Sequence, residues 1–247
     1  MFAHQDDELG ALPRIRWEAV SGAAVWCCFL TDGARAVAAG VRDRESLATL
    51  RAAGVDPERI GFVGSPRRVA DGRLAFETAF ALEALRAWAA AIPRLRTVYG
   101  LEWEGGHHDH DAACVIAAAY AAERGVPAMT FPLYNGWRRP RGWFRVASFV
   151  PAPGRIERRR LTLAEAMLPV RAMFGYPSQR RTWLGLGPGL AVRALARRTE
   201  SIREFDVRRL AAPPHPGTLL YEAMFGVSRA SVMDATAALR DTLLRGR

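Results

Sequence analysis

The chain has 247 residues, half of them apolar, and a formal net charge of +10. This length is enough for one large domain or two small ones. It contains no run of about 18 apolar residues, so no membrane-spanning helix is expected. The opening residues also lack the basic and apolar regions of a secretory signal. The three cysteines, at positions 27, 28 and 114, form no Cys-x-x-Cys pair and no even disulfide framework, so we expect a reducing cytoplasm.

The first half of the chain alternates between short apolar runs and amphipathic segments. Strands are predicted at 23–30, 60–63, 95–100 and 126–131, and helices at 9–20, 43–53, 74–91 and 112–124, the last with Asp109 as its N-cap. Alternating strands and helices predict a Rossmann-like three-layer α/β fold with a mostly parallel sheet. Only two or three strand-like residues precede His4, whereas a strand usually has about five or six, so we expect a start further upstream.

The second half, after Pro132, is richer in proline, tryptophan and arginine. A strand is predicted at 143–150 and helices at 163–173 and 228–244, while glycines and prolines predict a loop at 175–189. We expect a single domain over residues 1–247. In it, residues 1–131 would form the α/β core and residues 132–247 an elaboration that shapes a substrate pocket.

Four of the five histidines lie in two short stretches that are also dense in carboxylates. The stretches read His4-Gln5-Asp6-Asp7-Glu8 and Glu104-Gly105-Gly106-His107-His108-Asp109-His110-Asp111. Each lies between a predicted strand and a predicted helix, and ligands of open α/β sheets bind outside the carboxyl ends of the strands. Imidazole with carboxylate suits zinc or a similar borderline divalent ion. Either stretch alone would be an ordinary solvated helix start, but together they predict one shared metal site.

The two stretches carry a resemblance to a known family. Residues 3–8 resemble the Ala-His-Pro-Asp-Asp-Glu signature of the LmbE-like, or PIG-L, zinc-dependent de-N-acetylases, and residues 107–110 resemble their His-x-Asp-His signature. Weaker matches are Thr31-Asp32-Gly33, Arg42 with Glu45, and Asp71-Gly72. Gln5 departs from the usual Pro, and Gly105 stands where some members have a catalytic Tyr. The resemblance implies an enzyme that hydrolyses an N-acetyl amide on a sugar-containing substrate of the GlcNAc type.

The resemblance also implies the roles of the first stretch and of its partner. His4, Asp7 and His110 would bind Zn²⁺, or another divalent metal such as Fe²⁺. One metal position would stay open for the water that attacks the amide carbon. Asp6 would be the general base that takes the proton of that water. Its neighbour Asp7 would be committed to the metal, so the two adjacent carboxylates would have separate functions.

Further roles follow from the same resemblance. His107 would be protonated, stabilise the tetrahedral oxyanion and deliver a proton to the leaving amine. Asp109 would orient a histidine. Arg42 and Asp71 would contact substrate hydroxyls or phosphate. The expected partner is therefore a small N-acetylated sugar or glycoconjugate.

Two other classes of protein remain open from the residues alone. One is a different metal-dependent hydrolase, such as a phosphoesterase, although many of these use two metals and need more ligands. The other is a non-catalytic metal-binding module, which would not require an acidic residue at Asp6.

The basic excess has three interpretations: an arginine-rich solvated surface, contact with anionic lipid at the inner face of a membrane, or a site for phosphorylated or nucleotide-linked substrates. No nucleic-acid-binding motif accompanies the charge, so no nucleic acid is expected. The arginines cluster at Arg138-Arg139, Arg158 to Arg160, Arg180-Arg181 and Arg197-Arg198.

Two histidines lie outside the expected roles. His108 is about 100° from His107 around a helix, so it is expected to face the cavity rim or solvent. His215 lies between Pro214 and Pro216, and is expected in a surface loop.

Overall fold

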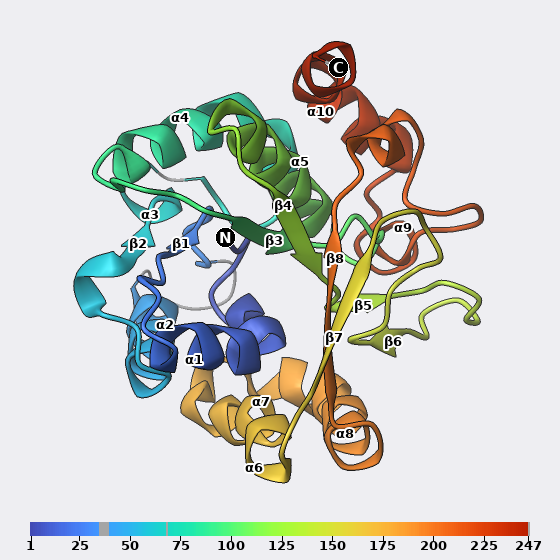
Figure 1. Cartoon of the computed structure of the whole chain (residues 1–247). Helices are drawn as coiled ribbons and strands as arrows, with labels where there is room; N and C mark the ends of the chain where they lie inside the picture. The colour runs from blue at the N-terminus through green and yellow to red at the C-terminus, as the bar shows by residue number, and fades with distance from the viewer. Residues whose placement is uncertain (35–39, 68, 247) are drawn as a thin grey trace.

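The computed structural model describes residues 1–34, 40–67 and 69–246. Strands occupy the centre of the molecule, with α4 and α5 on one side and α1 and α2 on the other (Figure 1). The strands are β1 (Cys27–Phe29), β2 (Ile60–Phe62), β3 (Val98–Leu101), β4 (Ala128–Phe131), β5 (Tyr134–Asn135), β6 (Arg145–Val146), β7 (Ile156–Arg160) and β8 (Thr199–Glu204). The α-helices are α1 (Leu12–Val20), α2 (Val41–Ala52), α3 (Gly64–Arg67), α4 (Thr78–Ala89), α5 (His108–Glu123), α6 (Leu163–Ala166), α7 (Leu168–Ala172), α8 (Arg180–Ala196), α9 (Leu220–Phe225) and α10 (Arg229–Arg245).

The expectation of a mostly parallel sheet is wrong, because the strands form a mixed arrangement. β1 pairs with β2 and β3 with β4 in parallel, whereas β8 is antiparallel to both β4 and β7. The larger sheet therefore has the order β3-β4-β8-β7. The two added strands are rich in arginine and glutamate. An antiparallel strand can keep one face in solvent, so β7 and β8 need no continuous apolar run that would reveal them in the sequence.

The second half also differs from expectation at residues 175–189. Most of this stretch lies in α8, with Pro188 inside the helix, rather than in a loop. Helix α8 packs against α6, α7 and β6, and such tertiary packing overrides the poor helix propensity of proline and glycine. The strand expected at 143–150 is reduced to β6. Within the described residues, no helix combines the length and the apolar character needed to cross a bilayer.

Helix α5 is the centre of the core. Every residue from His108 to Ala121 is buried, because α5 packs against β3 and β4 and is covered by α4 and α10. A run of alanines lets these neighbours approach closely, and a helix that is apolar on all sides is typical of a buried position. The amino end of α5 therefore places its polar residues, including three histidines of the site, inside the molecule.

The first residues of the chain lie between β1 and β3. Phe2 forms a parallel bridge with Phe29, and the Met1 ammonium donates to the Tyr99 carbonyl at 2.9 Å. The chain then leaves the sheet through residues 4–7. It reaches the same edge as the loop that leads from β3 into α5.

Candidate metal and catalytic centre

The loop of residues 4–7 is closed by its own polar groups. The His4 backbone N–H donates to Asp7 Oδ2 at 2.8 Å, and the Asp6 N–H donates to Glu8 Oε2 at 2.8 Å. Asp6 has a φ of 106°, in the left-handed region that non-glycine residues rarely adopt. Such strain costs about 1–3 kcal/mol and is concentrated at functional sites. The loop thus fixes two adjacent carboxylates in different directions.

The second stretch begins helix α5 with His107 as its N-cap, where Asp109 had been expected. The Asp109 backbone N–H donates to His107 Nδ1 at 3.1 Å. A ring nitrogen that accepts a hydrogen bond carries no proton, so this geometry assigns the neutral tautomer with the proton on Nε2. The expectation of a doubly protonated His107 does not fit this arrangement.

The two stretches meet around the Asp7 carboxylate. His110 Nε2 lies 3.1 Å from Asp7 Oδ1, and His4 Nδ1 lies 3.7 Å from Asp7 Oδ2. Nitrogen and oxygen ligands of a tetrahedral zinc ion lie about 2.0–2.2 Å from the metal, hence roughly 3.3–3.6 Å from one another. All three residues are buried. Their donor types suit a divalent cation, and the two imidazoles approach different oxygens of the Asp7 carboxylate.

His107 adds a third imidazole to this cluster. The ligand atoms of His4, His107 and His110 lie within 4.8 Å of one another. Its ring is 4.8 Å from that of His4 and 5.2 Å from that of His110, measured between centroids. His107 is thus close enough either to the cation or to a substrate beside it.

Asp109 connects His4 to the loop that follows Asp71. Its Oδ2 lies 3.1 Å from His4 Nε2 and accepts the Gly72 N–H at 2.7 Å. Asp71 Oδ1 is 3.4 Å from the same His4 nitrogen. With Nε2 directed at carboxylates, His4 presents Nδ1 toward Asp7, which is the carboxylate–histidine arrangement found at many metal sites.

These carboxylates also change the proton affinity of His4. Burial alone would lower the pKa of the imidazole, but Asp71, Asp109 and Asp7 together raise it from 6.5 to about 10 when no cation is present. A cation would have to displace the proton from Nδ1, since a ligating nitrogen must be unprotonated.

The adjacent carboxylates Asp6 and Asp7 differ in pKa. Burial raises the pKa of Asp6 from 3.8 to about 7; Arg42 opposes this rise and the negative charge of Asp7 adds to it. Burial would also raise the pKa of Asp7, but His110 and His4 lower it to about 2. Asp7 is therefore a permanent anion near neutral pH, whereas Asp6 can exchange a proton there.

Arg42 joins Asp6 to Asp71. Its Nη2 lies 2.9 Å from Asp6 Oδ1 and its Nη1 lies 3.1 Å from Asp71 Oδ2. The guanidinium also donates to the carbonyls of Gly33 and Gln5. The expected contacts of Arg42 and Asp71 with substrate remain a prediction, because in this structure both side chains are engaged with each other and with the site.

The expectation that His108 faces the rim or solvent is wrong. Its side chain is buried, stacks on the His107 ring at 4.4 Å between centroids, and lies with Nε2 2.9 Å from the Gly72 carbonyl. Because α5 is buried on every side, the His108 ring lies beside His107 and near Tyr221 and Phe225 rather than in water.

His215 is likewise buried, contrary to the expected surface loop. Its ring lies 5.4 Å from that of Trp137, and a Cβ added to Gly105 would lie 3.4 Å from its Nε2. Two prolines do keep this segment extended. The segment lies over the loop of the second stretch, which the local sequence does not reveal.

Several residues of the second half surround the site without a recognisable motif. The Tyr134 ring lies 5.3 Å from His110, and the Phe225 ring lies 4.7 Å from His107, both between centroids. Glu104 accepts hydrogen bonds from the backbone N–H groups of Leu133 and Tyr134 at 2.8 and 2.9 Å. The only sequence signal for these contacts is the aromatic content of the second half.

Comparisons with known proteins gave one family model and several solved structures of similar fold. Residues 1–121 match the family model PIG-L, GlcNAc-PI de-N-acetylase. A comparison with curated protein sequences found no match.

Similar solved structures include two deacetylases. The A40926 pseudoaglycone deacetylase Dbv21 is 18% identical with a TM-score of 0.61, and the alignment covers 82% of this chain and 94% of that chain. The zinc-inhibited form of the teicoplanin deacetylase Orf2 is 17% identical with a TM-score of 0.60, covering 82% and 95%. The conserved protein TT1542 from Thermus thermophilus is 20% identical with a TM-score of 0.55, covering 88% and 94%. At these identities, the likeness shows a shared fold.

Proposed function

Because the first half of the chain belongs to the PIG-L family, we propose that the protein is a metal-dependent hydrolase that removes an N-acetyl group from a sugar-containing substrate. One observation carries this proposal. Two imidazoles converge on Asp7 at the spacing of metal ligands, and a second carboxylate, Asp6, lies beside them with a pKa of about 7. Deacetylases among the solved structures of the same fold support it.

His4, Asp7 and His110 would hold the cation, Zn²⁺ or another divalent metal such as Fe²⁺. When bound, such an ion supplies Lewis acidity, which polarises an acyl carbonyl and lowers the pKa of a water toward about 7. Asp109 fixes the orientation of His4 from the opposite side of the ring.

Asp6 is the general base of the proposed reaction. It takes a proton from the attacking water as the oxygen adds to the acetyl carbon, and general-base catalysis is most efficient when the pKa lies near the operating pH. Arg42 fixes the Asp6 carboxylate at 2.9 Å and keeps part of it ionised near neutral pH.

His107 supplies the proton donor on the other side of the substrate. With Nδ1 accepting from the Asp109 backbone, its Nε2–H can donate to the oxygen that becomes negative in the transition state. As the tetrahedral intermediate collapses and the C–N bond breaks, the proton that Asp6 took from water passes to the departing nitrogen, which leaves as an amine. The products are acetate and an amino sugar.

A substrate panel with a base-deficient variant tests the proposal. Purified protein would be analysed for bound metal and incubated with N-acetylated sugars, thiol glycosides and glycolipids, with amine release as the readout. Asp6→Asn should retain the metal and lose about 10²–10⁴-fold in kcat. Asp56→Asn makes the same chemical change at an exposed helix cap and should leave turnover unchanged. A wild-type protein that binds metal but releases amine from none of these compounds would favour a non-catalytic module.

A further inference from the structure

Helix α8 carries large apolar side chains on its exposed side. Leu184, Val192 and Leu195 are 79%, 66% and 62% exposed, and Pro188 is exposed as well. At about 100° per residue, these four residues fall within an arc of about 80° and form an apolar stripe along the helix. A surface helix usually turns its apolar stripe to the core and its polar side to solvent, so α8 has the reverse arrangement.

Small residues attach α8 to the rest of the molecule. Gly187 and Ala194 are its buried residues, and Ala194 packs in a small cluster with Leu161 and Ala166. Gly187 allows a close approach of Met173, since an added Cβ would lie 2.8 Å from Met173 Cε. The inward side of the helix is therefore filled by small residues, while the larger apolar residues of the stripe remain in solvent.

Arginines border the apolar stripe at both ends. Arg181 lies within the arc of the stripe and Arg180 lies beside it, at the start of α8. Arg197 and Arg198 follow the last turn, and all four side chains are exposed. Residues 166–198 contain no aspartate or glutamate, but they contain six arginines, at 171, 180, 181, 193, 197 and 198. The outer surface of α8 is therefore positive as well as apolar.

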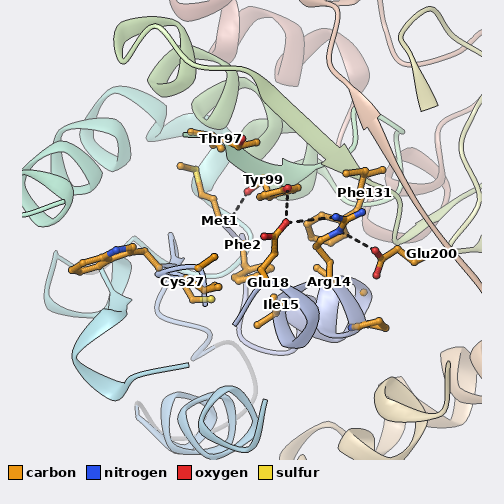
Figure 2. Close-up of a pocket in the computed structure, with 18 of the residues that line it drawn as sticks. Met1, Phe2, Arg14, Ile15, Glu18, Cys27, Thr97, Tyr99, Phe131 and Glu200 are labelled. Carbon is orange, nitrogen blue, oxygen red and sulfur yellow. Dashed lines mark hydrogen bonds and ion pairs between the residues drawn. The ribbon is translucent and has the colours of Figure 1, made fainter. Parts of the chain in front are cut away.

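Acidic residues around α8 are already paired with other arginines. A large groove lined in part by α8 contains Glu18 and Glu200, and Figure 2 shows Arg14 between these two carboxylates. Glu165, on α6, accepts a hydrogen bond from Arg159 at 2.6 Å. These carboxylates are thus neutralised by Arg14 and Arg159 and leave the positive charge of α8 uncompensated.

We propose that the exposed side of α8 docks on a lipid bilayer that carries anionic headgroups. A helix that binds in this way lies in the plane of the bilayer, with its apolar side inserted by about 5–10 Å and its basic side chains at the headgroups. Each arginine near an anionic surface strengthens binding by about fivefold. Because lipids diffuse in the plane of the bilayer, anionic headgroups can reach the arginines at both ends of the stripe.

The charge of α8 favours a bilayer over a second copy of this chain. A twofold dimer through α8 would place the same surface on both sides of the interface. The arginines of the two copies would then meet without acidic partners, which is unfavourable. The composition of the stripe also differs from that of a protein interface, whose binding energy comes mainly from Trp, Tyr and Arg and less often from Leu or Val.

Sedimentation with vesicles tests the apolar part of this proposal on the full chain. The protein should bind phosphatidylcholine vesicles that contain about 30% phosphatidylglycerol, and should bind pure phosphatidylcholine at least about tenfold more weakly. Val192→Gln should weaken binding to the anionic vesicles by about tenfold, because it removes an inserted apolar side chain. Val20→Gln makes the same change on α1 at an exposure of 67%, and should bind as the wild type does.

A pair of double variants tests the contribution of charge. Arg180→Gln/Arg181→Gln should weaken binding to the anionic vesicles by at least about tenfold and change binding to pure phosphatidylcholine little. Arg138→Gln/Arg139→Gln removes the same charge from two exposed positions between β5 and β6, and should have a much smaller effect.

Several results would overturn the proposal. They are no binding to the anionic vesicles, equal binding by Val192→Gln and Val20→Gln, or equal losses in the two double variants, which would indicate attraction by net charge alone. A dimer in the absence of vesicles that Val192→Gln dissociates would assign the surface to a second copy instead. None of these measurements depends on metal or on hydrolysis, so the outcome is separate from that of the proposed function.

Discussion

The two halves of the chain contribute to the centre in different ways. The first half supplies the cluster of imidazoles and carboxylates, whereas the second half makes hydrogen bonds with the loop that carries the second stretch. Glu104 accepts from the backbone of residues 133–134, the Leu220 N–H donates to the Gly105 carbonyl at 2.9 Å, and Arg209 donates to the Trp103 carbonyl at 2.9 Å. The proposed chemistry therefore depends on the side chains of two short motifs. The positions of these side chains depend on contacts with the second half, which mostly involve backbone N–H and carbonyl groups.

The largest effects are expected in the first half. His4→Ala, Asp7→Ala or His110→Ala should each weaken metal binding by more than about 100-fold. Loss of a residue that only hydrogen-bonds to a metal ligand typically weakens metal binding by about 10–100-fold. His107→Ala should retain the metal and lose about 10²–10³-fold in kcat, as for removal of an oxyanion donor. Metal analysis and steady-state kinetics distinguish variants that lose the metal from a variant that keeps the metal and loses turnover. Equal metal loss in His107→Ala and His110→Ala would overturn the assignment of different roles to these two histidines.

The next effect concerns pH. Asp6 must be ionised to act as a base, so activity should rise with pH through an acid limb at or below about 7, because a bound cation lowers the pKa further. Arg42→Gln removes a positive charge that lowers the Asp6 pKa, so the limb should move to higher pH. Each pKa unit reduces activity about tenfold on the acid side. An unchanged limb in this variant would show that Asp6 is not the group that titrates.

A smaller effect tests the contact between the halves. Gly105 has a φ of 71°, and an added Cβ would lie 2.7 Å from Leu219 Cδ2. Gly105→Ala should lower the free energy of unfolding by about 2–3 kcal/mol, from backbone strain plus displacement of Leu219. Gly125→Ala has a similar φ of 63° with no atom within 4 Å, so it should cost only about 1 kcal/mol. Urea unfolding measures both, and equal losses would mean that Leu219 adjusts freely.

The smallest effect lies in the segment that covers the site. Hydrogen bonds from Arg229 lower the pKa of Glu222 from 4.5 to about 2, and its carboxylate also accepts the Leu219 N–H at 2.7 Å. A depressed carboxyl pKa stabilises the folded state above pH 4.5, and this stability is lost as the pH falls toward 2. Glu222→Gln should lose about 1 kcal/mol at pH 7 and little at pH 2. Exposed Glu83→Gln is the control, with no comparable loss at either pH.

The sequence predicted the first half well because its signals are local. Short apolar runs revealed β1 to β4, and residues 4–7 and 107–110 do lie side by side, with the rings of His4 and His110 5.4 Å apart. The site roles assigned to these residues remain predictions.

The predictions failed where contacts between distant parts of the chain determine which residues are buried. Neighbours on every side of α5 bury His108, and Trp137 together with the Gly105 loop buries His215. Strands β7 and β8 escaped notice because their charged residues resemble a solvated surface.

In the proposed reaction, the capping of α5 by His107 would tie folding to turnover at one position. Asparagine and aspartate cap helices well, but neither offers an N–H in the place of Nε2. Alanine removes both functions, so its effect on rate would be mixed with fraying of a helix at the centre of the core. His107→Asn should keep the helix start and remove only the donor. Under the proposed mechanism, any substitution of His107 would have to replace both the helix cap and the proton donor at the same time.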